Sequence, residues 1–190
     1  MTMTAFEHWK HGYGVISHMP ETCERIDELA RYRGATGRAA SVGAVFQRLA
    51  AADRLTSATM WLIVHMTYAR RVALSGAPLP PEAFKANPEG HVGGSLNVAP
   101  AYMGYLAANA LTGTTRAWIL GQGHCVAAVE VANCLVGNLS PAQQGRYGAE
   151  EAGLSRSCED LSSYVIDPMG RPAAPFRGHV AGRGDPQVLV

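Results

Sequence analysis

The sequence has little charge and no long apolar run. Only 16% of its 190 residues are charged, its net charge is +1, and 47% of its residues are hydrophobic. A near-neutral chain offers no basic surface for nucleic acid or for an anionic membrane. Low charge density favours a surface that is partly covered by another subunit. We therefore expect a homo-oligomer or a partner chain, and no nucleic-acid or membrane partner.

Paired cysteine motifs and targeting segments are also missing. The four cysteines lie far apart with no C-x-x-C pair, which is typical of reduced cytosolic thiols rather than of a disulfide framework or a zinc site. We therefore assign no metal ligands. The N-terminus, MTMTAFEHWKHG, lacks the apolar core of a signal peptide. The most apolar segment, residues 59–67, is too short to span a bilayer. These features predict a cytoplasmic protein.

The pattern of apolar residues predicts a helix-rich α/β chain. Residues 1–56 form an N-terminal helical segment, residues 57–180 the main portion and residues 181–190 an irregular tail. Residues 117–120, Ala-Trp-Ile-Leu, are typical of a short buried strand. Helices are expected over residues 4–9, 20–32, 57–74, 96–111, 126–135 and 149–161, with others beginning at Ser41 and Ser140. The helices at 57–74 and 96–111 are apolar on most sides, so we expect both to be buried, the second in the core or at a subunit interface.

One histidine lies in a glycine-rich turn between the predicted strand and a helix. The turn is Gly121-Gln122-Gly123-His124, and it is followed by Cys125. The N-terminus of a helix after such a turn favours an anion such as a phosphate. It matches neither G-x-G-x-x-G nor the P-loop pattern. A tight turn with a partly buried histidine, and Cys125 as a buried thiol, is the plain alternative.

A second histidine also lies in a glycine-rich segment directly before a predicted helix. His91 stands among Gly90, Gly93 and Gly94, and Ser95 is the expected cap of the helix that follows. Three glycines around one histidine are not expected for packing, whereas they let a backbone lie close to a ligand. We therefore predict a cleft in which the His91 and His124 imidazoles meet one ligand. The other histidines have plainer interpretations: His65 as a satisfied core residue, and His8, His11 and His18 as surface residues.

Three pieces of the sequence carry a family resemblance. Residues 79–85, LPPEAFK, leading into Gly90-His91, resemble Leu-Lys-Pro-Glu-Asp-(Ile/Val)-Lys leading into Gly-His-Trp-Gly. Residues 121–124 resemble Gly-Pro-Gly-His, again before an Ala-Asn-rich helix. Residues 151–154, EAGL, and then Gly178-His179-Val180 are similar to Glu-Ala-Gly-Leu and Ser-His-Val. Over residues 57–180 the chain thus resembles the N-terminal part of a thiamine-diphosphate-dependent phosphoketolase, a family related to transketolases. It is most similar to a divergent branch labelled xylulose 5-phosphate 3-epimerase or phosphoketolase-like.

This resemblance implies an activity and a site. It implies the first part of a parallel-sheet, thiamine-diphosphate-binding domain and an aldehyde-lyase acting on ketose phosphates such as xylulose 5-phosphate. The cofactor would be thiamine diphosphate with magnesium, acting as the electron sink while protein groups orient and protonate the sugar. His91, His124 and His179 would be catalytic, since imidazoles titrate near working pH. Gly90, Gly121, Gly123 and His124 would lie against the cofactor.

Two departures from the family pattern limit that expectation. Val92 replaces the tryptophan of the family's His-Trp-Gly segment. The family's Gly-Asp-Gly motif, which holds magnesium, is absent, because Gly184-Asp185-Pro186 has proline in place of the second glycine. We therefore expect the chain alone to be inactive and to need a partner chain that supplies the missing half. The alternatives are a non-catalytic assembly or binding module, a sugar-phosphate epimerase, or a small helical protein without a ligand.

Overall fold

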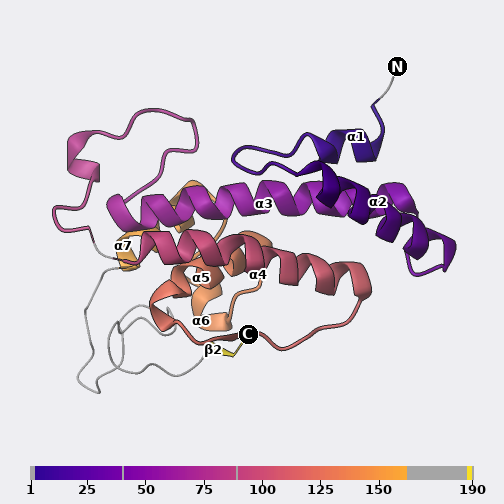
Figure 1. Ribbon diagram of the computed structural model, residues 1–190. Helices are drawn as coiled ribbons and strands as arrows, with labels where there is room; N and C mark the ends of the chain where they lie inside the picture. The colour runs from indigo at the N-terminus through magenta and orange to yellow at the C-terminus, as the bar shows by residue number, and fades with distance from the viewer. Residues whose placement is uncertain (1–2, 40, 89, 162–187, 190) are drawn as a thin grey trace. The chain divides into compact units, whose positions relative to one another are not determined.

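Helices make up most of the described structure, as the sequence predicts (Figure 1). The computed structural model describes residues 3–39, 41–88, 90–161 and 188–189. The elements are, in chain order, α1 (Ala5–Lys10), α2 (Pro20–Ala35), α3 (Val42–Tyr68), the 3₁₀ turn η1 (Pro81–Ala83), α4 (Val92–Thr112), β1 (Ile119–Leu120), the 3₁₀ turn η2 (Gly123–Cys125), α5 (Val126–Val136), α6 (Pro141–Gln144), α7 (Glu151–Asp160) and β2 (Val188–Leu189). No helix among the described residues combines the length and the apolarity needed to cross a bilayer.

The chain divides into two compact units. The first comprises Met1–Ala58 and Met103–Arg116, and the second comprises Thr59–Tyr102 and Ala117–Val190. Both units share α3 and α4, since each of these helices begins in one unit and ends in the other. The boundary expected between residues 56 and 57 lies inside α3.

An aromatic cluster forms the core of the first unit. Trp9, only 4% exposed, has its ring centroid 5.3 Å from that of Phe46 and 4.3 Å from that of His18. His18 Nε2 lies 2.8 Å from Asp53 Oδ2. The prediction that His18 is a surface residue is therefore wrong, because its ring fills space beside Trp9 and its polar edge is paired. The predicted cap of α1 is confirmed, as the Thr4 hydroxyl accepts from the Glu7 N–H at 3.1 Å.

One continuous α3 replaces two predicted helices. The expected break before Ser57 does not occur, because the Thr56 hydroxyl donates to the carbonyl of Ala52 at 2.7 Å within the helix. No glycine or proline lies between Leu49 and Ser57 to interrupt it. The helix ends at Tyr68 rather than at residue 74, since Tyr68 O accepts from the Lys85 N–H at 2.9 Å. Pairing with the chain segment that follows η1 thus overrides local helix preference.

The core of the second unit is built from one face of α3 packed against other helices, among which α5 is buried over most of its length. Leu62, Ile63 and Met66 of α3 are at most 1% exposed and pack with α5 and α7. Trp61, Val64 and Tyr68 lie on the other side of α3 and are exposed. The prediction that this helix lies in the core is therefore confirmed for one face, while the opposite face lies at the surface. A helix with apolar side chains on several faces need not be buried on all of them, because one face is enough to fill the core.

The start and the burial of α4 also differ from the prediction. The helix begins at Val92, so Ser95 lies inside its first turn instead of capping it. Within α4 only Ser95, Ala99, Tyr102 and Met103 are buried. The expectation of a helix buried in the core on all sides is wrong, and its role as a subunit interface stays a prediction.

The predicted strand exists but pairs differently. β1 lies inside the expected range 117–120 and pairs antiparallel with β2, with Ile119 opposite Leu189 and Leu120 opposite Val188. Leu120 is buried and Ile119 is 56% exposed. The described residues contain no parallel pair, so the helix-rich part of the predicted fold class is confirmed and its parallel sheet is not.

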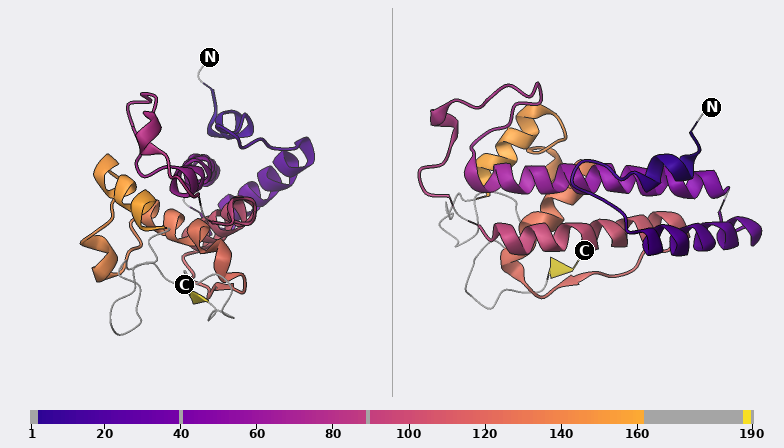
Figure 2. Two further views of the ribbon diagram at one scale, coloured as in Figure 1. Left: turned by 90° about the vertical axis from the view of Figure 1, so that its left-hand side faces the viewer. Right: turned by 45° about the horizontal axis from the view of Figure 1, so that its top comes forward.

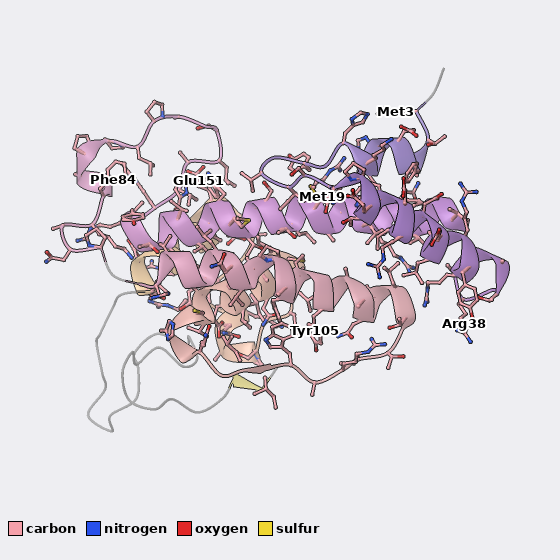
Figure 3. All side chains as sticks on the ribbon, viewed as in Figure 1. Met3, Met19, Arg38, Phe84, Tyr105 and Glu151 are labelled. Atoms are coloured by element: carbon pink, nitrogen blue, oxygen red, sulfur yellow. The ribbon has the colours of Figure 1, made fainter. Side chains whose placement is uncertain are left out.

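The long connection from α3 to α4 carries η1 and is held against α7. It can be followed in Figure 2 from the end of α3. The Leu74 N–H donates to Glu151 Oε2 at 2.8 Å, and Figure 3 labels Glu151 on α7. The helix predicted from Ser140 is confirmed as α6, with Ser140 and Gln143 forming a reciprocal capping box. These contacts hold the connection against α7 and cap α6 within the second unit, which carries the candidate site.

Candidate functional site

His91 and His124 lie side by side in the second unit. Their ring centroids are 4.5 Å apart and the ring planes meet at 72°, an edge-to-face arrangement. His91 precedes the first residue of α4 and His124 lies in η2. Both side chains are exposed. The fold therefore brings together the two histidines that the sequence singles out, from segments far apart along the chain.

The start of α4 holds the His91 imidazole. His91 Nδ1 accepts a hydrogen bond from the Gly94 N–H at 3.2 Å. An N-cap side chain accepts the same hydrogen bond from the third residue of a helix, so His91 caps α4, and the prediction of Ser95 as the cap is wrong. Since Nδ1 accepts, the neutral ring carries its proton on Nε2. His91 therefore presents an N–H donor at Nε2.

A short turn after β1 holds His124 and Cys125. The Cys125 N–H donates to Gln122 O at 2.9 Å, which closes η2 directly before α5. Cys125 is fully buried, as predicted, and its thiol contacts Gln122 Oε1 at 3.9 Å. Burial raises the pKa of the Cys125 thiol above its usual value, because the thiolate would lose its hydration. The thiol is therefore protonated at neutral pH in the absence of a metal.

Gly94 is a packing residue between two side chains of the site. A Cβ at Gly94 would lie 2.4 Å from His91 Nδ1 and 2.6 Å from Cys125 Sγ, both far inside contact distance. The expectation that the glycines around His91 are not there for packing is therefore wrong for Gly94. By contrast, a Cβ at Gly93 would meet nothing within 4 Å.

The glycines expected to contact a cofactor differ from one another. Gly90 has φ +130°, a conformation that other residues rarely adopt, so glycine is needed there for the backbone alone. Among the described residues, a Cβ at Gly121 would meet nothing within 4 Å, so neither packing against them nor a positive φ explains that glycine, and they leave open space beside it. Gly123 is the first residue of η2. His179 lies outside the described residues.

His91, His124 and Cys125 together offer three potential metal ligands. One ligand atom from each residue lies within 4.8 Å of the other two, and within the described part of the chain no other group of three or more His, Cys, Asp or Glu side chains is as close. The sequence reading assigns no metal ligand because Cys125 has no cysteine partner nearby along the chain. In the sequence, Cys125 directly after His124 is the feature that points to this group, once the two histidines are placed together.

The remaining histidines that the structure describes lie outside this group and differ in their surroundings. His65 is half-buried, its ring centroid lies 4.0 Å from that of Trp61, and its Nδ1 lies 3.0 Å from Trp61 O. It is satisfied, as predicted, although it lies at the edge of the core rather than within it. His8 and His11 are exposed, as predicted.

A polar network that the sequence reading does not identify packs inside the second unit. Asp160, 5% exposed, pairs with the guanidinium of Arg146 and accepts from the Tyr147 hydroxyl at 2.7 Å. Burial opposes ionisation of Asp160, but these two hydrogen bonds and the guanidinium charge outweigh it and lower the pKa of the carboxyl. Gln143 Nε2 donates to the buried Glu130 at 2.6 Å. Each carboxylate is thus held by donors of the fold, which makes the network structural.

No family model, curated protein or solved structure matches this chain. The resemblance to phosphoketolases therefore stays a prediction, and the function has to be argued from the residues of the site.

Proposed function

We propose that this chain is the N-terminal part of a thiamine-diphosphate-dependent lyase similar to phosphoketolases, acting on ketose phosphates such as xylulose 5-phosphate. One observation carries the proposal. The two histidines of the Gly-His segments, which the resemblance makes catalytic, have ring centroids 4.5 Å apart. A helical protein without a ligand has no need to pair two exposed imidazoles.

The two histidines suit contact with the reacting atoms of a bound sugar phosphate. His91 offers a donor at Nε2, with the ring held by Gly94, and such a donor suits a sugar hydroxyl or carbonyl oxygen. The His124 imidazole is exposed and can contact a second oxygen of the same ligand. The open space beside Gly121 leaves room for a ligand next to η2. When bound, thiamine diphosphate would supply the electron sink for cleaving the carbon–carbon bond.

The site does not fit the magnesium of the cofactor. Magnesium prefers oxygen ligands in octahedral geometry. The close donor group that the described residues offer contains two imidazoles and a thiol, with no carboxylate. Among the described residues this group therefore offers no suitable magnesium ligand, and, as the resemblance implies, the chain alone is expected to be inactive.

Calorimetric titration of thiamine diphosphate with magnesium, and separately of xylulose 5-phosphate, into the full chain tests the proposal. Saturable binding is expected, weak because the magnesium half is missing, on the order of 1 mM or about 4 kcal/mol. His91→Ala and His124→Ala should each weaken it at least tenfold. His65→Ala removes an imidazole from the same unit and should leave it unchanged. Absence of binding at millimolar ligand, or binding that both site variants retain, would overturn the proposal in favour of a non-catalytic assembly module.

A further inference from the structure

The donor atoms of His91, His124 and Cys125 lie close together. The three lie no more than 4.8 Å apart. Tetrahedral zinc, with bonds of about 2.0–2.3 Å, places neighbouring nitrogen and sulfur ligands roughly 3.3–3.6 Å apart. The group therefore has to contract by about 1 Å at its widest separation, which small rotations of two exposed imidazoles can supply.

Cys125 is the one buried residue of the three and the least free to move. Cys125 is 0% exposed and lies where η2 meets α5, so its Sγ has little freedom to move. The two imidazoles are exposed and come from separate segments. A rigid thiol with two adjustable imidazoles is an arrangement that can close on an ion arriving from solvent.

Gly94 is a second, independent indication of a built site. It is the residue whose Cβ would collide with both His91 Nδ1 and Cys125 Sγ, at 2.4 and 2.6 Å. The neighbouring Gly93 faces open space. The absence of a side chain at position 94 thus keeps the space between an imidazole nitrogen and the thiol sulfur free.

We propose that His91, His124 and Cys125 form a binding site for a divalent transition metal, with zinc as the best match. Two imidazoles and one thiolate suit zinc or cobalt, whereas magnesium and calcium prefer oxygen. Three protein ligands leave the fourth tetrahedral position open, and exposure of both imidazoles lets water or another small ligand occupy it. On binding, the Cys125 S–H contact to Gln122 is exchanged for a sulfur–metal bond, and one proton passes to solvent. This site does not depend on the proposed lyase function.

Cobalt titration of the full chain, without thiamine diphosphate, tests the site directly. A tetrahedral cobalt complex with one thiolate gives intense visible bands and a near-ultraviolet sulfur-to-cobalt charge-transfer band. We expect both to appear with one equivalent of cobalt and to disappear when zinc is added. Cys125→Ser should remove the charge-transfer band, and His124→Ala should cost more than the roughly 10–100-fold in affinity that loss of an outer-shell group costs. Cys23→Ser, a buried thiol of the first unit, should change neither band.

Two glycine variants separate a metal site from an accidental grouping of ligands. Gly94→Ala keeps all three donor residues but places a methyl group between two of them, so cobalt affinity should fall at least tenfold. Gly93→Ala adds the same methyl group one residue earlier in α4, where it meets nothing, and should bind cobalt as the parent does. Circular dichroism verifies that each variant is folded.

Three outcomes would overturn the metal site: no charge-transfer band at excess cobalt, a band that survives in folded Cys125→Ser, or equal affinities in the two glycine variants. Failure of the lyase proposal is seen separately, since Cys125→Ser should leave binding of thiamine diphosphate and sugar phosphate unchanged. If the parent chain binds thiamine diphosphate but does not bind cobalt, the metal site is refuted and the lyase proposal is not.

Discussion

A pair of glycine-to-alanine substitutions in α4 gives the sharpest test of the site geometry through stability alone. Gly93 and Gly94 are adjacent in the first turn of the same helix, so helix propensity changes in the same direction at both positions. Replacing glycine by alanine in a helix is worth up to about 1 kcal/mol in favour of alanine. The two positions differ in what a Cβ meets.

The expected cost at Gly94 follows from the overlap. The added methyl group would lie 2.4 Å from His91 Nδ1 and 2.6 Å from Cys125 Sγ, so each atom must move by roughly 1 Å to reach ordinary contact. His91 is exposed and can swing away, but it then loses the hydrogen bond from Gly94, worth about 0.5–1.5 kcal/mol. Cys125 is fully buried, and forcing it aside is an overpacking change of about 1–3 kcal/mol. After the gain in propensity, Gly94→Ala should be destabilised by about 1–3 kcal/mol.

Urea denaturation followed by far-ultraviolet circular dichroism measures the difference between the two variants. Gly93→Ala should be as stable as the parent or up to about 1 kcal/mol more stable. A folded Gly94→Ala with the same midpoint as Gly93→Ala would refute the packing of His91 and Cys125 against residue 94. The metal site would lose support with that packing, because His91 and Cys125 supply two of its three ligands.

Two further changes probe the two cores. Asp160→Asn should lower the free energy of unfolding at neutral pH by about 1–3 kcal/mol, less than the 3–5 kcal/mol of a fully buried pair because the side chain of Arg146 is 39% exposed. Since the pKa of Asp160 is lowered in the fold, its contribution is complete above the unfolded value of about 3.9 and declines as pH falls from there through the folded pKa. Urea midpoints measured at stepwise lower pH should therefore converge for parent and variant below about pH 4, and a constant gap would contradict the assignment. Trp9→Ala should cost about 3–5 kcal/mol in the same assay, because it empties the centre of the aromatic cluster against Phe46, and a loss below about 1 kcal/mol would show that this cluster is not a core.

Local rules were sufficient for most helices of the chain. Thr4 caps α1 and Ser140 caps α6 through side-chain bonds that depend only on neighbouring residues. Tertiary contacts decided the cases where the prediction is wrong. Tyr68 ends α3 because its carbonyl pairs with Lys85, and no periodicity within residues 57–74 carries that information.

The site was predictable in part, for a similar reason. Glycines next to each histidine pointed to His91 and His124 separately, and the structure brings the two together. The role of Gly94 could not be read from the chain, because a glycine that is needed for close packing and a glycine that is needed for a turn look alike in sequence. Cys125 joins the group only through the placement of η2 beside the start of α4, which no local pattern specifies.

The hydrogen bond from the Gly94 N–H to His91 Nδ1 distinguishes sugar binding from metal binding at the histidine pair. A neutral imidazole has one nitrogen lone pair, and in His91 the Gly94 N–H occupies it at Nδ1. A sugar oxygen that accepts from Nε2–H leaves this bond intact. A metal removes it in either geometry: coordination at Nδ1 replaces the Gly94 hydrogen, and coordination at Nε2 requires the proton to move to Nδ1, where it can no longer accept. Metal binding therefore gives up a helix cap worth about 0.5–2 kcal/mol, while sugar binding retains it. Coordination at Nε2 would also remove the N–H that the sugar oxygen needs, so in that geometry the two occupants exclude each other, and zinc would act on the proposed lyase site as an inhibitor rather than as its cofactor.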